Sequence, residues 1–485
     1  MLRLVRIVLQ IISIICLTLL FLDFSGTLQP WLGWLAKIQL IPAALHHPAP
    51  VILFALVLAT FVFGRLYCSV VCPMGIVQDF FNWLGMKKSR NHFHYTSENR
   101  WLRFIVLAVF IVLFIVGLSS YAALIDSYSI YGRISNNFFA PLYRYINNLA
   151  AEYAVSHDSL AFYNVDNSFA PSLMLYISGG TLLMFAVVSF FAGRWWCSNV
   201  CPVGTALSLV SRFSLLRPVF DTSKCNGCKL CAHRCKASCI NPQEHKVDMS
   251  NCVVCFDCVK NCRLGAISFG FRKYTKSSSS ADTSRRNFIT GAVALGSLSA
   301  VDVVAKTVDG GLTIIEDKKP PKRAVRLIPA GALSIDHFAQ HCTGCQLCVS
   351  NCPNKVLRPS MALDSFMQPE MSYESGYCRP ECTRCSEVCP TGAIRPIVRI
   401  EKSSTQIGHA VWIADNCVVN TDKVSCGNCA RHCPAGAITM VEQGGYEIPA
   451  IDTERCIGCG ACEHLCPARP FSAIYVEGHK DHRII

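Results

Sequence analysis

Thirty cysteines mark this chain of 485 residues, and most of them fall into six short runs. Two runs in the middle of the chain have the form Cys-x2-Cys-x2-Cys-x3-Cys: Cys225, Cys228, Cys231 and Cys235, then Cys252, Cys255, Cys258 and Cys262. Bacterial two-cluster ferredoxins use this spacing, with three cysteines on one [4Fe–4S] cluster and the fourth on the other. We therefore predict one cluster on Cys225, Cys228, Cys231 and Cys262, and a second on Cys252, Cys255, Cys258 and Cys235.

A disulfide scaffold or a zinc knuckle fits these closely spaced cysteines less well. Disulfide scaffolds are usually short secreted chains, and zinc knuckles would not repeat the full ferredoxin spacing twice. The two central runs depart from the ferredoxin pattern in one respect, because Lys236 and Arg263 stand where proline usually follows the fourth cysteine. An extra Cys239 could also replace Cys235 as ligand, and the choice between the two stays open.

Four further runs lie in the last third of the chain. Their cysteines are Cys342, Cys345, Cys348 and Cys352; Cys378, Cys382, Cys385 and Cys389; Cys417, Cys426, Cys429 and Cys433; and Cys456, Cys459, Cys462 and Cys466. Proline follows the last cysteine of each. Ala-Ile pairs at 393–394, 437–438 and 473–474, like the pair at 266–267, predict a short strand after these loops. The sequence thus predicts six [4Fe–4S] clusters in all, with Cys417 the least regular ligand because an eight-residue gap follows it.

A repeated segment holds four cysteines in another pattern. Residues 64–75 and 193–204 both read Gly-Arg-x2-Cys-x3-Cys-Pro-x-Gly. Each copy follows an apolar stretch, so Cys68, Cys72, Cys197 and Cys201 should share one membrane depth near a pseudo-twofold axis. Four such thiols could hold a further metal centre, form reversible disulfides or serve only in packing, and the sequence leaves all three open. Cys16, alone in an apolar stretch, is best explained as a small buried residue.

The composition indicates that part of the chain lies in a bilayer. Hydrophobic residues make up 52% and charged residues 16%, with mean hydropathy +0.34, whereas soluble domains are about a quarter charged. Apolar stretches at 7–22, 48–64, 104–125 and 168–193 predict a four-helix transmembrane domain, since a span needs about 20 residues. Basic residues cluster before the first stretch, between the second and third, and after the fourth. The positive-inside rule puts these flanks in the cytoplasm, and Asp23 and the loop 126–166 outside.

The net charge of +13 does not indicate nucleic-acid binding, because no basic run is interleaved with aromatic residues. Each cluster with four thiolates also brings about two negative charges that the excess base would balance. A Ser-rich stretch at 276–284 precedes Arg285 and Arg286, and a mildly apolar run follows at 290–305. This order resembles a twin-arginine export signal. The sequence has no Cys-x2-Cys-His and no Gly-x-Gly-x2-Gly motif, so c-type haem attachment and dinucleotide binding are not indicated.

We therefore expect a membrane α-helical domain combined with α+β domains of the bacterial ferredoxin kind. The expected boundaries are 1–215 for the four-span domain, 216–275 for a cytoplasmic two-cluster domain, 276–320 for the linker with its signal or anchor, and 321–485 for an exported four-cluster domain. The protein would lie in a bacterial cytoplasmic membrane. Its N-terminus and two-cluster domain would face the cytoplasm and its four-cluster domain the periplasm.

The arrangement of these motifs resembles two protein families joined in one chain. Residues 1 to about 275 resemble NapH/MauN ferredoxin-type membrane proteins, and residues from about 284 onward resemble NapG/MauM four-cluster proteins. The resemblance implies a quinol-oxidising electron-transfer module. It also implies nested ligation, in which the first distal run exchanges its last cysteine with the fourth and the second with the third. Cys466 would then join Cys342, Cys345 and Cys348, and Cys433 would join Cys378, Cys382 and Cys385. Spacing alone allows adjacent runs to pair equally well.

These expectations describe a membrane-bound electron carrier, the electron-transfer subunit of a quinol dehydrogenase. It would pass electrons from the membrane quinone pool or a cytoplasmic ferredoxin to an exported reductase or cytochrome. Candidate quinone contacts on the outer face are His46, His47, Trp31 and Trp34, although an aromatic interface belt accounts for the tryptophans equally well. The alternative function is an accessory protein that matures a periplasmic redox enzyme or senses its redox state.

Overall fold

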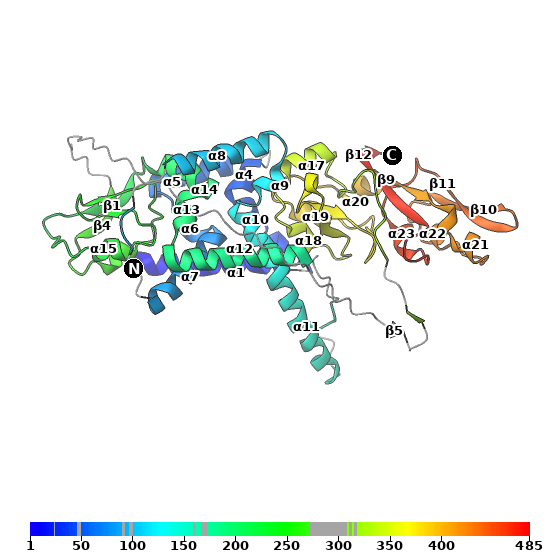
Figure 1. Cartoon of the computed structure of the whole chain (residues 1–485), viewed down its shortest axis with the longest axis horizontal. Helices are drawn as coiled ribbons and strands as arrows, with labels where there is room; N and C mark the ends of the chain where they lie inside the picture. Colours follow the sequence, from blue (N-terminus) through cyan, green and yellow to red (C-terminus); the bar gives the residue numbers. More distant parts are fainter. Residues whose placement is uncertain are drawn as a thin grey trace, which may run out of the picture.

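The computed structural model describes residues 1–23, 25–45, 50–89, 93–96, 100–158, 162–165, 172–271, 308–309, 313–314 and 318–485. These residues form an elongated molecule with three parts (Figure 1). A small β module lies at the end that holds the N-terminus, helices fill the middle, and a second β module holds the C-terminus at the opposite end. The predicted linker, the twin-arginine signal, His46 and His47 lie outside the described residues.

The middle part of the described chain is built from six longer helices with shorter helices between them. The longer ones are α1 (Leu2–Leu22), α5 (Pro50–Phe63), α7 (Pro73–Ser89), α8 (Arg100–Ile115), α11 (Ala140–Val155) and α12 (Ser172–Ala192). The others are α2 (Gln29–Leu32), α3 (Trp34–Lys37), α4 (Leu40–Leu45), α6 (Tyr67–Val70), α9 (Ser119–Ala122), α10 (Ser127–Ile134), a π-helix (Ser135–Phe139), α13 (Trp195–Asn199) and α14 (Pro202–Ser211).

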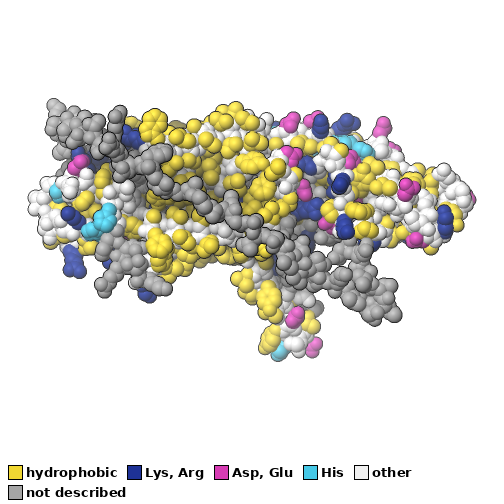
Figure 2. Space-filling view, in the orientation of Figure 1, with side chains coloured by type: hydrophobic (Ala, Val, Ile, Leu, Met, Phe, Trp, Pro, Cys, Tyr) yellow, Lys and Arg dark blue, Asp and Glu magenta, His cyan; other side chains and the backbone are white. Residues whose placement is uncertain are grey.

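Two of the described helices, Leu2–Leu22 and Leu173–Ala192, are long and apolar enough to cross a membrane. This is weak evidence for membrane association, and the predicted four-helix transmembrane domain is not confirmed. The helices at the second and third predicted spans, α5 and α8, have 14 and 16 residues, fewer than the roughly 20 that a span needs. Hydrophobic side chains nevertheless cover the middle part over a broad area (Figure 2), on helices α1, α5, α8 and α12 among others.

The segment after α8, which the sequence predicts on the outer side of the membrane, begins with a buried helix. Asp126 and all eight residues of α10 are buried. Asp126 caps this helix, since its carboxylate accepts bonds from the backbone N–H of Ser129 at 2.9 Å and from its hydroxyl at 2.7 Å. A carboxylate at the N-terminus of a helix satisfies N–H groups that would otherwise have no partner. The segment therefore turns inward and packs against α7 and α12.

The module at the N-terminal end has a ferredoxin-like arrangement of short elements. Strand β1 (Leu216–Phe220) pairs antiparallel with β4 (Ile267–Phe271), and a hairpin of β2 (Ile240–Asn241) and β3 (Lys246–Val247) lies between the two cysteine runs. Helices α15 (Leu230–His233) and α16 (Asp257–Asn261) complete it. The strand predicted after the second run is confirmed, because β4 begins at Ile267.

The C-terminal module contains three antiparallel strand pairs. These are β7 (Leu357–Pro359) with β8 (Pro369–Met371), β10 (Ile438–Gln443) with β11 (Tyr446–Ile451), and β9 (Thr405–Trp412) with β12 (Ile474–Ile484). Its helices are α17 (Ile335–His341), α18 (Leu347–Ser350), α19 (Arg384–Val388), α20 (Arg399–Ser404), α21 (Val418–Thr421), α22 (Asn428–Arg431) and α23 (Ala461–Leu465), with 3-10 turns at Leu363–Ser365 and Ala414–Asn416. A separate short pair joins β5 (Val308–Asp309) and β6 (Thr313–Ile314).

The strands predicted from the distal Ala-Ile pairs are confirmed at two of three places. Strand β10 begins at Ile438 and β12 at Ile474, whereas no strand begins at Ile394. Ala393 and Ile394 are instead buried at 1% exposure in the core shared with the helical part. Packing rather than strand pairing therefore accounts for the apolar pair at that position.

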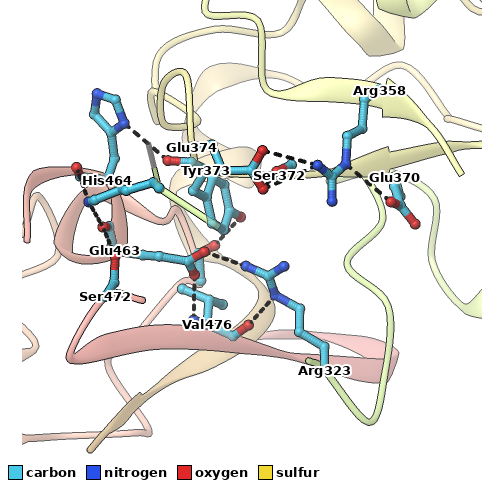
Figure 3. A network of polar contacts seen from close by, with 12 residues as sticks. Arg323, Arg358, Glu370, Ser372, Tyr373, Glu374, Glu463, His464, Ser472 and Val476 are labelled. Atoms are coloured by element: carbon cyan, nitrogen blue, oxygen red, sulfur yellow. Dashed lines mark hydrogen bonds and ion pairs between the residues drawn. The ribbon is translucent and has the colours of Figure 1, made fainter. Parts of the chain in front are cut away.

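A buried carboxylate stabilises the C-terminal module (Figure 3). Glu463 accepts from Arg323 Nη2 at 2.5 Å and from the backbone N–H of Val476 at 2.8 Å. It thereby joins α23 to the segment before the first distal run and to β12. Nearby, the hydroxyl of Tyr373 donates to the carbonyl of Gly458 at 2.6 Å. This network connects the first half of the module to the second.

Both modules pack firmly onto the helical part. On the N-terminal side, the backbone N–H of Arg194 donates to the carbonyl of Lys236 at 2.8 Å. On the C-terminal side, the hydroxyl of Ser119 donates to the carbonyl of Cys342 at 2.8 Å, and that of Tyr121 to the carbonyl of Leu363 at 2.7 Å. One continuous buried core includes Phe21 and Tyr128 of the helical part together with distal residues such as Phe338.

Candidate iron–sulfur sites

The cysteine loops owe their curvature to residues with left-handed backbone. Lys229 (φ 57°), Phe256 (61°), Gln346 (62°), Gly427 (93°) and Gly460 (79°) each stand directly before a helix of four or five residues. That helix contains the third cysteine of its run. A positive φ reverses the backbone over one residue, so that the three cysteines can face a common centre. The second distal run differs, since Thr383 before α19 has a φ of −108°.

Glycine is required at one of these positions. A Cβ atom on Gly460 would lie 2.3 Å from the ring of Tyr373, which is far inside contact distance. Tyr373 itself is 1% exposed and lies close to the sulfurs of Cys378 and Cys459. This tyrosine therefore packs where the second and fourth distal runs meet.

The central module brings together the cysteines that the ferredoxin spacing predicted. Cys225, Cys228, Cys231 and Cys262 line one cavity of about 500 Å³. Cys252, Cys255 and Cys258 line a second cavity with Cys235 and Cys239. Among the described residues, no three His, Cys, Asp or Glu side chains approach closely enough to ligate a single metal ion.

Cys235 and Cys239 remain neighbours in the second central site. Their sulfurs are 3.4 Å apart, and Cys235 lies close to Cys255 and Cys258. Cys239 is also hydrogen-bonded to Cys252, so both thiols lie at this site. The ferredoxin spacing favours Cys235 as the ligand, which leaves Cys239 as a hydrogen-bonding neighbour of its sulfur.

We expect Cys239→Ser to keep both central clusters and to change only a midpoint potential, because a hydroxyl can still donate to the Cys235 sulfur. Cys235→Ser should lose one cluster of the pair. Iron content and EPR-monitored redox titration of the full chain would measure both effects. If Cys239→Ser loses a cluster and Cys235→Ser keeps both clusters, the ligand is Cys239 instead.

The distal runs exchange their last cysteines with their neighbours in sequence. Cys389 lies close to Cys342, Cys345 and Cys348, and Cys352 lies close to Cys378 and Cys385. Cys433 lies close to Cys456, Cys459 and Cys462, while Cys466 lines a cavity with Cys417, Cys426 and Cys429. The nested exchange that the resemblance implied is therefore wrong: Cys466 does not join Cys342, and Cys433 does not join Cys378.

A hairpin accounts for each exchange. Strands β7 and β8 lie between the first and second distal runs, and β10 and β11 lie between the third and fourth. Each hairpin reverses the chain and folds one run against the next, so that α18 packs on α19 and α22 on α23. The central module uses β2 and β3 in the same way. Cys417 joins its group despite its long spacer, since residues 418–421 of that spacer form α21.

Two families of known proteins match parts of the chain. Residues 45–91 and 177–220, which contain the four cysteines of the repeat, match the 4Fe-4S binding domain family, and residues 341–393 and 424–469 match the 4Fe-4S dicluster domain family. The methylamine utilization ferredoxin-type protein MauM of Methylophilus methylotrophus is 34% identical over 164 residues, covering 31% of this chain and 70% of the relative. MauM of Methylorubrum extorquens is 31% identical over 202 residues (38% and 84%). The ferredoxin-type protein NapG of Escherichia coli is 30% identical over 197 residues (38% and 80%).

The chain belongs to the MauM/NapG family of ferredoxin-type proteins. No solved structure matches it. The two dicluster matches of this MauM/NapG chain cover the two pairs of adjacent distal runs except for Cys417, which precedes the second match. They agree with the grouping by hairpins. The matched families support [4Fe–4S] binding and electron transfer, whereas the relation to NapH/MauN is not confirmed.

The four cysteines of the repeat meet in the middle of this MauM/NapG-family chain. Cys68, Cys72, Cys197 and Cys201, here called the quartet, are 3–4% exposed. All six pairs among them are close enough to interact electrostatically. The repeat therefore does bring its cysteines together. Cys16 lies apart from them on α1 and packs against the core.

Sequence reasoning missed the arginines beside the quartet. Arg65 and Arg194 are the second residues of the two repeats, where they read as positive charges flanking a membrane span. Both are fully buried, at 0% exposure. The sequence did contain a signal for a specific role, because Gly-Arg stands at the same position in both repeats. An arginine that only flanked a membrane span could lie at any nearby position.

The proposed quinone contacts do not form a site in the described part of the chain. Trp31 is 76% exposed and Trp34 is 56% exposed, and neither lines a described cavity. Their exposure fits an interface position better than a binding pocket.

Proposed function

We propose that the protein is a membrane-bound electron conduit that joins a donor on one side of the bilayer to an exported redox enzyme on the other. The observation that supports this most directly is the order of the cysteine sites along the molecule. The central module, the quartet and the four distal sites follow one another from one end to the other. Each is close to the next, and an electron could therefore pass along the whole length.

The links between successive sites are specific contacts. Arg194 lies close to both Cys255 of the central module and Cys197 of the quartet. The hydroxyl of Ser127 is 3.2 Å from the sulfur of Cys201, and the adjoining Tyr128 lies close to Cys345. These contacts connect the cysteine sites of the central module to those of the distal module through the quartet.

The distal sites are linked in the same manner. Cys348 lies close to Cys385, and the backbone N–H of Cys378 donates to the carbonyl of Cys459 at 2.9 Å. The two cluster sites of one ferredoxin-type unit exchange their fourth cysteines, and they are therefore adjacent. The distal sites thus form an unbranched row that ends at the Cys417 site.

The apolar surface of the middle part suggests how the protein sits in a membrane. Exposed hydrophobic residues gather there, while charged residues are more frequent at both ends (Figure 2). We propose that α1, α5, α8 and α12 cross or enter the bilayer, with the N-terminus and central module in the cytoplasm and the distal module in the periplasm. Basic flanking residues support this orientation.

Membrane quinol or a cytoplasmic ferredoxin would be the donor, and an exported reductase or cytochrome the acceptor. The protein part of such a conduit binds and insulates the clusters and sets their potentials through burial and hydrogen bonds to sulfur. Six [4Fe–4S] clusters on the ferredoxin-type cysteines would supply the one-electron carriers. The protein would act as the electron-transfer subunit of a quinol dehydrogenase.

The test uses the full chain in lipid vesicles that contain trapped cytochrome c. Dithionite outside should reduce the trapped cytochrome only in vesicles that contain the protein. A parallel EPR experiment should show reduced clusters after addition of menaquinol to the detergent-solubilised protein. Clusters that dithionite reduces without any reduction of trapped cytochrome would rule out a conduit across the membrane.

A further inference from the structure

The two repeats hold each other by a reciprocal pair of hydrogen bonds around the quartet. Arg65 Nη2 of the first repeat donates to the carbonyl of Cys197 at 2.9 Å, and Arg194 Nη1 of the second donates to the carbonyl of Cys68 at 2.8 Å. The glycines that end the repeats lie against the same two carbonyls. A Cβ on Gly75 would be 2.2 Å from the Cys68 oxygen, and one on Gly204 2.3 Å from the Cys197 oxygen. The repeat thus builds one symmetric site rather than two separate turns.

The charge around this site is not symmetric. Arg194 forms an ion pair with Asp79 at 2.7 Å, but the position equivalent to Asp79 in the second repeat holds Ser208. Arg65 consequently has no carboxylate partner among the described residues, and its Nε atom is buried without a hydrogen bond. A buried cation without a counter-charge costs several kcal/mol. The site therefore suits an anionic occupant next to Arg65.

Groups beside the sulfurs resemble those that surround thiolate ligands. The backbone N–H of Gly204 lies 3.4 Å from the sulfur of Cys201, and Arg65 Nη2 lies 4.0 Å from that of Cys68. Ser127 Oγ contacts Cys201 as well. Gln78, fully buried, is an exception, because its oxygen accepts from the Cys197 thiol at 3.2 Å while its amide nitrogen has no partner in the described residues. Donors directed at sulfur stabilise thiolates and tune cluster potentials.

The quartet also lies where the two buried cores meet. Cys72 belongs to the core that continues into the distal module, whereas Cys68 and Cys201 belong to the core that continues into the central module. A carrier at this point would be the one link between the cytoplasmic and exported sites. Disulfides would transfer electrons in pairs, which does not match one-electron neighbours on both sides.

We propose that Cys68, Cys72, Cys197 and Cys201 together ligate a seventh iron–sulfur cluster, shared between the two repeats and balanced by Arg65. The cluster would accept one electron from the Cys252 site and give one electron to the Cys342 site, with no bond made or broken. Its existence rests on the geometry of the quartet. Its role as a relay rests on the proposed function.

The first test is the iron content of the full-length protein purified without oxygen. Six four-iron clusters bring about 24 iron atoms per chain, and a seventh raises this to about 26 or 28, for two or four further irons. Cys72→Ser should lower the content by the same two to four atoms and leave the ferredoxin-type EPR signals. Cys16→Ser is the matched control, because it removes a thiol that lies apart from the quartet, and it should change nothing.

A second measurement covers the case in which Cys72→Ser fails to fold. Wild-type protein should show no disulfide peptides that involve the quartet, and Mössbauer spectra should contain a component beyond six clusters. About 24 irons with quartet disulfides would overturn the proposal. If the protein holds only six clusters but still reduces trapped cytochrome c, the seventh cluster is refuted and the conduit stands. If it holds seven clusters but does not reduce trapped cytochrome c, the seventh cluster stands and the conduit is refuted.

Discussion

Replacing Cys345 by serine is expected to reduce electron passage between the two ends of the protein by at least about a hundredfold. Cys345 belongs to the distal site nearest the quartet, since Tyr128, which follows Ser127, lies close to it. A serine keeps the side-chain shape but is a poor ligand for iron. Electrons from the central module would then reach no carrier in the distal module. The vesicle assay with trapped cytochrome c measures the loss directly.

The same variant separates a conduit from an accessory maturation protein. In a conduit, the exported partner enzyme remains fully active with artificial electron donors, and only its supply of electrons is lost. In a maturation factor, the partner stays inactive even with those donors. Cys16→Ser is the control, as it alters a cysteine of α1 that packs against the core. Unchanged passage in Cys345→Ser would contradict the proposed route.

Asp79→Asn is expected to destabilise the protein by about 3–5 kcal/mol. The carboxylate of Asp79 lies 2.7 Å from Arg194, 2.7 Å from Lys236 and 3.2 Å from Arg6. The side chains of these three cations are only 0–5% exposed. A neutral amide leaves them buried with weaker compensation, and it removes the link between α1, α7 and the central module.

This loss of stability is measured by heating the detergent-solubilised chain and using size-exclusion chromatography to find the fraction that remains folded at each temperature. A loss of 3–5 kcal/mol corresponds to a fall in Tm of about 10 °C for a domain of this size. Glu370→Gln is the matched control, because its partner Arg358 is 33% exposed and water can solvate it. The control should lose clearly less stability. Equal losses for the two variants would show that the buried cations around Asp79 are not the cause.

Cysteine spacing predicted the candidate sites well because ligands of one cluster must be close in sequence or follow a fixed pattern. Three neighbouring cysteines wrap around a common centre whatever the rest of the fold does. The origin of the fourth cysteine depends on which run folds against which, and spacing leaves that open. Only the short hairpins between runs decide it, and β7 and β8 have just three residues each.

The helical part was harder to predict for a different reason. Apolar composition identified the stretches that form α1 and α12, but it could not show that α5 and α8 are short or that α10 turns inward. Burial of Arg65 and Arg194 was missed because an arginine after an apolar stretch usually marks a membrane surface, although the repeated Gly-Arg indicated a shared role. The partners of these charged residues lie far away in sequence, and the repeat does not identify them.

The shared core around Phe21, Tyr128 and Phe338 has a consequence for kinetics. The distal module packs into the helical part instead of moving freely on a linker, so the sites on either side of Ser127 are held at a fixed separation. Two separate proteins would need to collide, and their exchange would slow on dilution or with added salt. Within this one chain the step is unimolecular. Its rate should not depend on protein concentration, and every donor site has its own acceptor in strict one-to-one proportion.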